Sequence, residues 1–211
     1  MRHTRTSRAV AAGLTAAALA TTGLVAAPAQ AAPGTTSLAE VLAADGNRLD
    51  GNWDDFDIVE KAVYAVLDAK PDSPVAVLAD GDTALTAFVP TDRAFRRLVH
   101  DLTGERKARE RGVLRAVTAF ADADTLESVL LYHVVPGSTI TYHQAKQADG
   151  ARLTTALGSK IGVNVVDHGV RLRDRDRDDR NPRVVRALKN VNKGNEQIAH
   201  GINRVLRPLD L

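Results

Sequence analysis

The spacing of apolar residues changes along this 211-residue chain, and that change limits the folds open to it. Before Gly137 the apolar residues recur three and four positions apart, which is typical of amphipathic helices. After Gly137 they alternate with polar residues, as in strands that bury one face. Helices are therefore expected mainly in the first half and strands in the second. This order favours an α+β fold over a parallel βαβ sheet.

Two helices of the first half are predicted from their capping residues. Asp57, with Glu60 three positions later, resembles a helix N-terminus, and Pro71 follows the apolar pattern of that helix. Thr91 or Asp92 is expected to cap a second helix, because either side chain can accept a hydrogen bond from a free N–H of the first turn.

The remaining elements follow from local pattern. Residues 125–133 predict a further helix, which Pro136 and Gly137 end. Residues 103–115 are heavily charged and are expected on the outside, as a loop or a helix. Short strands are expected over residues 85–89, 161–165, 170–172 and 198–202.

The first 31 residues have the three parts of a secretory signal peptide. A positive start precedes an uncharged, Ala- and Thr-rich stretch over residues 9–27, and small residues follow at Ala29 and Ala31. Cleavage after Ala31 is expected, since the stretch is only weakly apolar for a membrane anchor. The mature chain is therefore predicted to be secreted, extracellular or loosely associated with a cell surface, without a transmembrane segment.

The basic character of the whole chain comes from this leader. The chain has 28 Lys and Arg against 26 Asp and Glu, a net charge of +2. Three of the arginines lie in residues 1–31 with no acid, so the mature chain is close to neutral. Overall charge therefore provides no argument for binding to nucleic acid or to a membrane.

Several kinds of chemistry are excluded by missing residues and motifs. The chain has no Cys, which rules out disulfides, Cys-bound zinc and thiol catalysis. It has no G-x-S-x-G, H-E-x-x-H or glycine-rich phosphate motif. We therefore expect no catalytic residues, no cofactor and no metal. Two alternatives stay open: a secreted hydrolase, which needs converging carboxylates or a His–acid pair, and a binder of a small apolar ligand, which needs an apolar cavity.

Three segments together resemble the signature motifs of fasciclin domains. Residues 86–98 (TAFVPTDRAFRRL) are similar to the first signature, residues 130–137 (LLYHVVPG) to the central one and residues 200–208 (HGINRVLRP) to the closing one. They occur in the family's order over nearly all of the mature chain. The motif positions expected to serve the fold are Phe88, Pro90, Thr91, Phe95, Pro136, Gly137, His200 and Pro208.

The resemblance implies a compact α+β wedge, in which a small β-sandwich is flanked by helices. It also implies a non-enzymatic role in adhesion to cells, matrix or polysaccharide. The closing motif departs from the family, because Glu196 and Gln197 stand where Asn-Gly is usual and Asn203 replaces Asp. The turn that enters the last strand is therefore expected to differ in shape.

Tyr132 and His133 are binding candidates through the resemblance, since the corresponding pair in animal relatives is implicated in adhesion to cell-surface receptors. The residue pattern favours another interpretation, because His133 shares an apolar helix face with Leu130. A buried, hydrogen-bonded His and a ligand contact both stay open. His200 alternates with Ile202 and is expected to be buried.

Residues 171–183 are the most unusual stretch, with six Arg and four Asp. Alternating signs predict a solvated loop or hairpin extension whose charges pair with one another. A polyanion contact through Arg173, Arg175 and Arg177 also stays open, but no aromatic residue is present to stack on bases. The aspartate spacing mimics the start of a calcium loop, yet Asp179 stands where that loop needs Gly.

The predicted organisation has three parts: a cleaved signal peptide over residues 1–31, a lead-in over residues 32–50 and a fasciclin-like domain over residues 51–211. A charged insertion occupies residues 173–183 of the domain. We expect a monomer that binds a cell-surface or extracellular-matrix protein or polysaccharide, and no nucleic acid.

Overall fold

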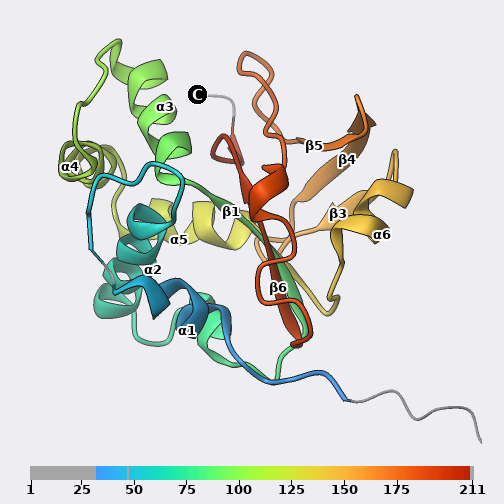
Figure 1. The fold of residues 1–211 in the computed structure, drawn as a ribbon. Helices are drawn as coiled ribbons and strands as arrows, with labels where there is room; N and C mark the ends of the chain where they lie inside the picture. Colours follow the sequence, from blue (N-terminus) through green and yellow to red (C-terminus); the bar gives the residue numbers. More distant parts are fainter. Residues whose placement is uncertain (1–31, 47, 210–211) are drawn as a thin grey trace, which may run out of the picture. The chain divides into compact units, whose positions relative to one another are not determined.

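In the part of the chain that the structure describes, all but one of the α-helices precede Gly137 and most strands follow it, in a mixed α+β fold (Figure 1). The α+β fold predicted from the change in apolar spacing is thus confirmed. The computed structural model describes residues 32–46 and 48–209. The predicted signal peptide lies outside the described residues. Among the described residues, no helix is both long and apolar enough to cross a membrane.

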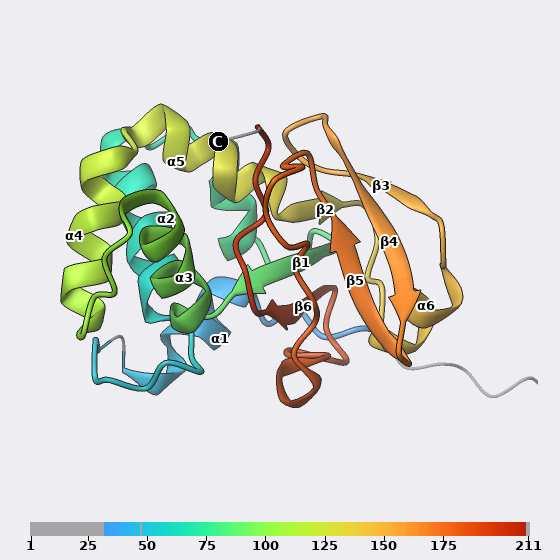
Figure 2. The same cartoon turned by 90° about the horizontal axis from the view of Figure 1, so that it is seen from above.

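Helices α2 to α5 gather on one side of the central strands (Figure 2). The helices are α1 (Leu38–Leu42), α2 (Asp57–Ala69), α3 (Asp92–Thr103), α4 (Glu110–Phe120), α5 (Ala123–Tyr132) and α6 (Tyr142–Gln147). Short 3-10 turns occur at η1 (Ala43–Asp45), η2 (Pro74–Ala79) and η3 (Arg186–Leu188).

Capping explains where two of these helices begin. The Thr91 side chain accepts a hydrogen bond from the N–H of Ala94 and caps α3, as predicted. The predicted capping role of Asp57 is wrong, because Asp57 is the first residue of α2 and Phe56 precedes it without a side-chain cap. Instead, the Asp92 carboxylate accepts the N–H of Ile58 at 2.9 Å, so the first residue of α3 caps α2.

Helix α4 is a correction to the expectation that residues 103–115 lie on the outside. Glu110 and Val113, at its start, are 2% and 0% exposed. The arginines around them obscured an apolar pattern in which Val113 and Val117 lie one helical turn apart and face the core.

Two small three-stranded sheets complete the fold. The strands are β1 (Leu85–Pro90), β2 (Val134–Pro136), β3 (Arg152–Thr154), β4 (Lys160–Val166), β5 (Gly169–Arg173) and β6 (Gln197–Ile202). The first sheet has the order β2-β1-β6, with β1 antiparallel to β2 and parallel to β6. The second sheet, β3-β4-β5, is antiparallel throughout.

Strand β1 lies between two hydrophobic clusters. Ala87 and Val89 belong to the cluster formed with the helices, and Phe88 belongs to the cluster formed with the second sheet. Because side chains alternate across a strand, β1 places residues in both clusters and is buried along its whole length.

Residues predicted as a lead-in pack into the same unit, which begins at Pro33. Leu38 is fully buried in the helical cluster, and its N–H donates to the Gln197 side chain at 2.8 Å. The Gln197 amide also donates to the carbonyls of Val77 and Asp80. The residue that departs from the family's closing motif therefore ties α1 and η2 to β6.

The other motif positions lie at bends and in the core. Phe95 is buried, and Pro90 ends β1 immediately before the cap of α3. Pro136 ends β2, and Gly137 follows with a left-handed φ of 74° that favours glycine. Pro208 is partly buried near the end of the described chain.

Candidate functional site

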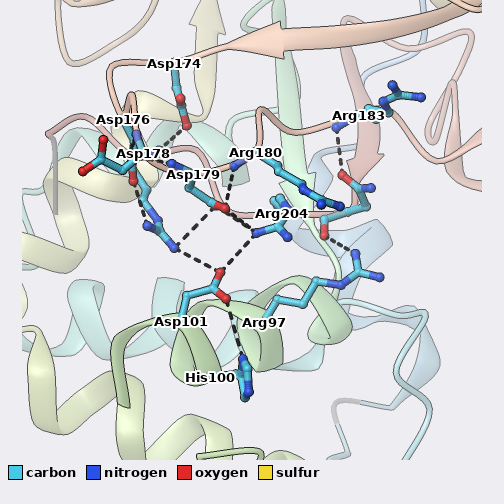
Figure 3. A network of polar contacts seen from close by, with 12 residues as sticks. Arg97, His100, Asp101, Asp174, Asp176, Asp178, Asp179, Arg180, Arg183 and Arg204 are labelled. Carbon is cyan, nitrogen blue, oxygen red and sulfur yellow. Dashed lines mark hydrogen bonds and ion pairs between the residues drawn. The ribbon is translucent and has the colours of Figure 1, made fainter. Parts of the chain in front are cut away.

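The aspartates of the charged insertion, here called the Arg/Asp loop (residues 173–183), bond to the chain's C-terminal segment (Figure 3). Asp176 accepts a hydrogen bond from Arg207 Nη1 at 2.7 Å, and the two side chains are only 1% and 7% exposed. Asp174 accepts the backbone N–H of Arg207 at 3.0 Å. The loop therefore has a buried ion pair at its base.

Arg204 connects the loop to helix α3. Its Nη1 donates to both carboxylate oxygens of Asp179, at 2.6 and 2.9 Å, and lies 3.1 Å from Asp101 of α3. Arg207 also lies 3.5 Å from Asp101 and from Asp179. Two arginines thus join three segments that are far apart in the sequence.

Burial and hydrogen bonding act in opposite directions on these carboxyl groups. Burial favours a raised pKa for Asp176, but donation from Arg207 and from the N–H groups of Asp179 and Asp178 outweighs it and lowers the pKa. For Asp174 burial prevails, and it raises the pKa to about 6. Asp176 is therefore the carboxylate that the structure holds ionised.

The arginines of the loop are on the surface. Arg173, Arg175, Arg177, Arg180 and Arg183 are all exposed. The expectation that the loop pairs its own charges is wrong for Asp176 and Asp179, whose ion-pair partners are Arg207 and Arg204. These partners come from outside the loop, and exposed Arg183 lies 3.7 Å from Asp167, which is also outside it.

Two surface pockets lie beside this network and share Arg97. The larger, about 660 Å³, is lined by Arg97, Arg171, Asp179, Arg180, Asn181, Arg183, Asn203 and Arg204. The smaller, about 310 Å³, is lined by Arg93, Arg96, Arg97, His100 and Arg106. The one carboxylate among these residues, Asp179, is bound by Arg204. Together these two pockets form the arginine surface of the molecule.

Helix α3 positions the arginines that lie outside the loop. Arg93, Arg96 and Arg97 are three and four positions apart and so share one side of the helix, while Phe95 packs in the core. Arg97 donates to the carbonyl of Asn203 at 2.6 Å. Burial, aided by the positive charges of Arg204 and Arg93, lowers the pKa of Arg97, although an arginine keeps its proton at neutral pH.

The predicted and observed basic residues overlap only in part. Arg173, Arg175 and Arg177 do not line either pocket. The arginines of α3 and Arg204 were not predicted. The spacing of the α3 arginines was visible in the sequence. That α3 lies beside the Arg/Asp loop, more than 70 residues later in the chain, was not.

Tyr132 and His133 lie inside the fold. Tyr132 is 0% exposed, its hydroxyl donates to the Lys160 carbonyl at 3.3 Å, and burial raises its pKa to about 12. The two ring nitrogens of His133 contact the Val129 carbonyl at 2.7 Å and the N–H of Leu206 at 2.9 Å. In this structure neither side chain presents a surface to a partner.

His200 has a similar environment on β6. It is 0% exposed, its Nδ1 accepts the N–H of Asn190 at 3.2 Å, and its Nε2 bonds to the Ile140 carbonyl at 2.8 Å. Burial lowers its pKa, so the ring is neutral and serves as a bridge between segments.

Comparison with known proteins identifies the family of this chain and a solved structure with a similar fold. A sequence model of the fasciclin domain matches residues 63–208. Among solved structures, the chain is similar to a FAS1 domain pair from the insect cell adhesion molecule fasciclin I, with 16% identity and a TM-score of 0.53. That similarity covers 82% of this chain and 51% of the pair, so this chain spans about half of the pair's length. A search of curated proteins found no match.

These findings agree with the three signature motifs and with the two small sheets flanked by helices. The likeness to the solved pair concerns the fold, and the sequence match spans well over half of the chain. The chain belongs to the fasciclin domain family.

Proposed function

We propose that this chain is a secreted, non-enzymatic adhesion module that binds an acidic polysaccharide of a cell surface or extracellular matrix. The arginine surface is the observation that carries the proposal. Fasciclin domains are generally non-catalytic binding modules and are usually extracellular. The predicted signal peptide supports export.

The chemistry of arginine suits such a ligand. A planar guanidinium donates two parallel hydrogen bonds to a carboxylate or sulfate group. Arg180 and Arg183 are exposed and are the first to meet a ligand. The Arg183 side chain lies 3.7 Å from that of Asp167, and both are exposed, whereas Arg204 is held by Asp101 and Asp179. Two adjoining pockets that share Arg97 suit a polymer whose negative charges repeat along its length.

Nucleic acid is a poorer fit for this surface. Neither pocket is lined by a Phe, Tyr or Trp side chain on which a base could stack, and His100 of the smaller pocket is the one ring among the lining residues. The lining therefore favours a negatively charged ligand that has no aromatic bases.

The test is binding of the purified chain from Ala32 onward to a uronic acid polymer, a sulfated polymer and neutral dextran, by calorimetry at low and high salt. We expect binding to at least one acidic polymer, none to dextran, and weaker binding at high salt because salt screens exposed charges. The double variant Arg180→Gln with Arg183→Gln should weaken binding roughly tenfold or more, since each lost ionic contact is worth about 1 kcal/mol.

The matched control changes the same charge on the same loop outside the pockets. Arg173→Gln with Arg175→Gln should have a much smaller effect than the pocket variant. Equal effects of the two variants would assign binding to the loop's total charge and not to the pockets. Absence of binding to any acidic polymer at low salt would overturn the proposal and favour the hydrolase or small-ligand alternatives.

A further inference from the structure

Three helices begin with an acidic residue, and these residues converge at one place away from the arginine surface. Asp57, Asp92 and Glu110 are the first residues of α2, α3 and α4. Asp55 lies in the segment just before α2. The helices contact one another, so their N-terminal ends bring carboxylates together from three separate parts of the chain.

The carboxylates are close enough to share one ion. Asp55, Asp92 and Glu110 can each offer an oxygen such that all three oxygens lie within 4.8 Å of one another. Asp50, Asp55 and Asp57 form a second such set, which shares Asp55 with the first. This acidic cluster (Asp50, Asp55, Asp57, Asp92 and Glu110) runs from an exposed edge at Asp50 to a buried end at Asp92.

At the buried end, each of two carboxylates has a hydrogen-bond partner on only one of its two oxygens. Asp92 Oδ1 accepts the N–H of Ile58 and Glu110 Oε2 accepts the N–H of Gly51, both at 2.9 Å. Among the described residues, Asp92 Oδ2 and Glu110 Oε1 have no hydrogen-bond partner. The two residues are 0% and 2% exposed, so water does not solvate these oxygens freely. An ionised oxygen buried in this way is costly unless a positive charge meets it.

The helix dipoles compensate only part of the negative charge. Each helix N-terminus is equivalent to roughly half a positive charge, so three of them supply about +1.5. The buried set alone carries three negative charges when ionised. The side chains that act most strongly on Asp92 by charge, Asp55, Glu110 and Asp57, are themselves acidic. When all three carboxyls are ionised, the negative charge that the helix ends do not offset would be opposed by a bound divalent cation.

A route from solvent to the cluster is present. A surface pocket of about 390 Å³ is lined by Asp50, Trp53 and Glu110, among others. Arg109 and Arg111 also line this pocket, but both are exposed and can turn toward water. The pocket thus opens the cluster to solvent from Asp50 to Glu110.

We propose that Asp55, Asp92 and Glu110 bind a hard divalent cation, with Asp50 and Asp57 at its outer side. An all-oxygen set of carboxylates selects calcium-type or magnesium-type ions over zinc. Ligands from two helix ends and from the segment before α2 favour Ca²⁺, which accepts irregular coordination, over Mg²⁺, which needs a near-ideal octahedron. The ion would lock the N-terminal ends of three helices together, independently of the arginine surface.

The first test uses Tb³⁺, which replaces Ca²⁺ at oxygen sites and luminesces when a nearby indole is excited. Trp53 is the single Trp of the chain and lines the entry pocket. We expect Tb³⁺ emission on excitation of Trp53 in the metal-free chain, its displacement by Ca²⁺, and weaker competition by Mg²⁺. Calorimetry should give one Ca²⁺ per chain. At about 100-fold excess over the Kd, Ca²⁺ should raise the Tm by roughly 5 °C or more.

Isosteric variants locate the site. Asp92→Asn and Glu110→Gln keep the hydrogen bonds to Ile58 and Gly51 and remove a repelling charge, so both are expected to fold. Each should weaken Ca²⁺ binding roughly tenfold or more, because affinity follows the number of charged ligands. Asp54→Asn, an exposed acid of the same loop that pairs with Arg93, should bind as the wild type does.

Two results would overturn the inference. The first is a wild-type chain that shows neither Tb³⁺ emission nor a Ca²⁺-dependent Tm, which would mean that the carboxyls hold protons instead of an ion. The second is a double variant, Asp92→Asn with Glu110→Gln, that binds Ca²⁺ as tightly as the wild type, which would place the ion elsewhere. Failure of polysaccharide binding leaves either result unchanged, because the two sites use different residues.

Discussion

The two ring nitrogens of His133 have opposite roles. Nδ1 must donate to the Val129 carbonyl, and Nε2 must accept from the N–H of Leu206. Only the neutral ring with its proton on Nδ1 satisfies both contacts. Burial lowers the pKa of His133 to about 4, so the neutral form persists in the fold at pH values where an exposed His is charged.

This pKa predicts how stability depends on pH. In the unfolded chain His133 has its ordinary pKa, about 6.5, so unfolding takes up a proton between pH 6.5 and about 4. Its contribution is present above pH 6.5 and is lost as the pH falls through that range. Between pH 6.5 and about 4, the wild type should lose up to about 1.4 kcal/mol more of its unfolding free energy per pH unit than His133→Gln does.

Urea denaturation at a series of pH values measures this difference. His143→Gln is the matched control, because His143 is an exposed residue of α6 that takes no part in these contacts. Parallel pH profiles for wild type and His133→Gln would show that His133 does not take up the proton.

Among the elements, the short C-terminal segment has strong connections to its surroundings. Arg204 and Arg207 join it to α3 and to the Arg/Asp loop, and the Arg207–Asp176 pair is almost fully buried. A buried pair adds little over an apolar equivalent, but removing one partner leaves a buried charge. The pair therefore fixes the position of the loop more than it increases total stability.

Arg207→Met should lower the free energy of unfolding by about 3–5 kcal/mol, because it leaves the Asp176 carboxylate buried without its cation. Adding Asp176→Asn removes that charge and keeps an oxygen for the N–H groups of Asp178 and Asp179. The double variant should therefore lose less than Arg207→Met alone. Chemical denaturation of the wild type, Arg207→Met, Asp176→Asn and the double variant measures the coupling energy between the two side chains. If the effects of the two single changes simply add, Arg207 and Asp176 do not form a direct pair.

At the scale of the whole molecule, residues 33–50, which precede the family motifs, complete the fold. Leu38 packs in the helical cluster, and Gln197 links it to η2 and β6. A fold that starts at residue 51 would leave that cluster open on one side and the Gln197 oxygen without its donor. The described domain therefore needs residues that precede its family motifs.

Leu38→Ala should cost about 2–5 kcal/mol of unfolding free energy, since it opens a cavity at a fully buried position. Leu102→Ala is the control, because Leu102 is 41% exposed and its truncation should change stability by about 0.5 kcal/mol or less. Thermal or urea unfolding measures both. A cost for Leu38→Ala no larger than that of the control would show that the segment is peripheral.

The predictions that held depend on neighbours in the sequence. Thr91 caps α3 by accepting the N–H of Ala94, three residues later, and the two-residue alternation of β4 and β5 follows from the geometry of a strand. Strand β6 was expected to alternate as well, but it is buried along its whole length because it lies in the core. The burial of α4 was missed because Arg111 and Arg115 lie among its buried residues Val113 and Val117 in the sequence. Arg173, Arg175 and Arg177 were chosen for charge alone, and charge does not say which arginines line a pocket.

The amino-acid sequence by itself determined the family, the α+β class and the points where several elements begin and end, because these depend on residues a few positions apart. Only the tertiary structure decided which charges meet. Asp101 meets Arg204 across more than 100 residues, and the acidic cluster joins Asp55, Asp92 and Glu110 from three segments. Such contacts depend on how helices and sheets pack, and packing brings together residues whose spacing along the chain has no period to detect.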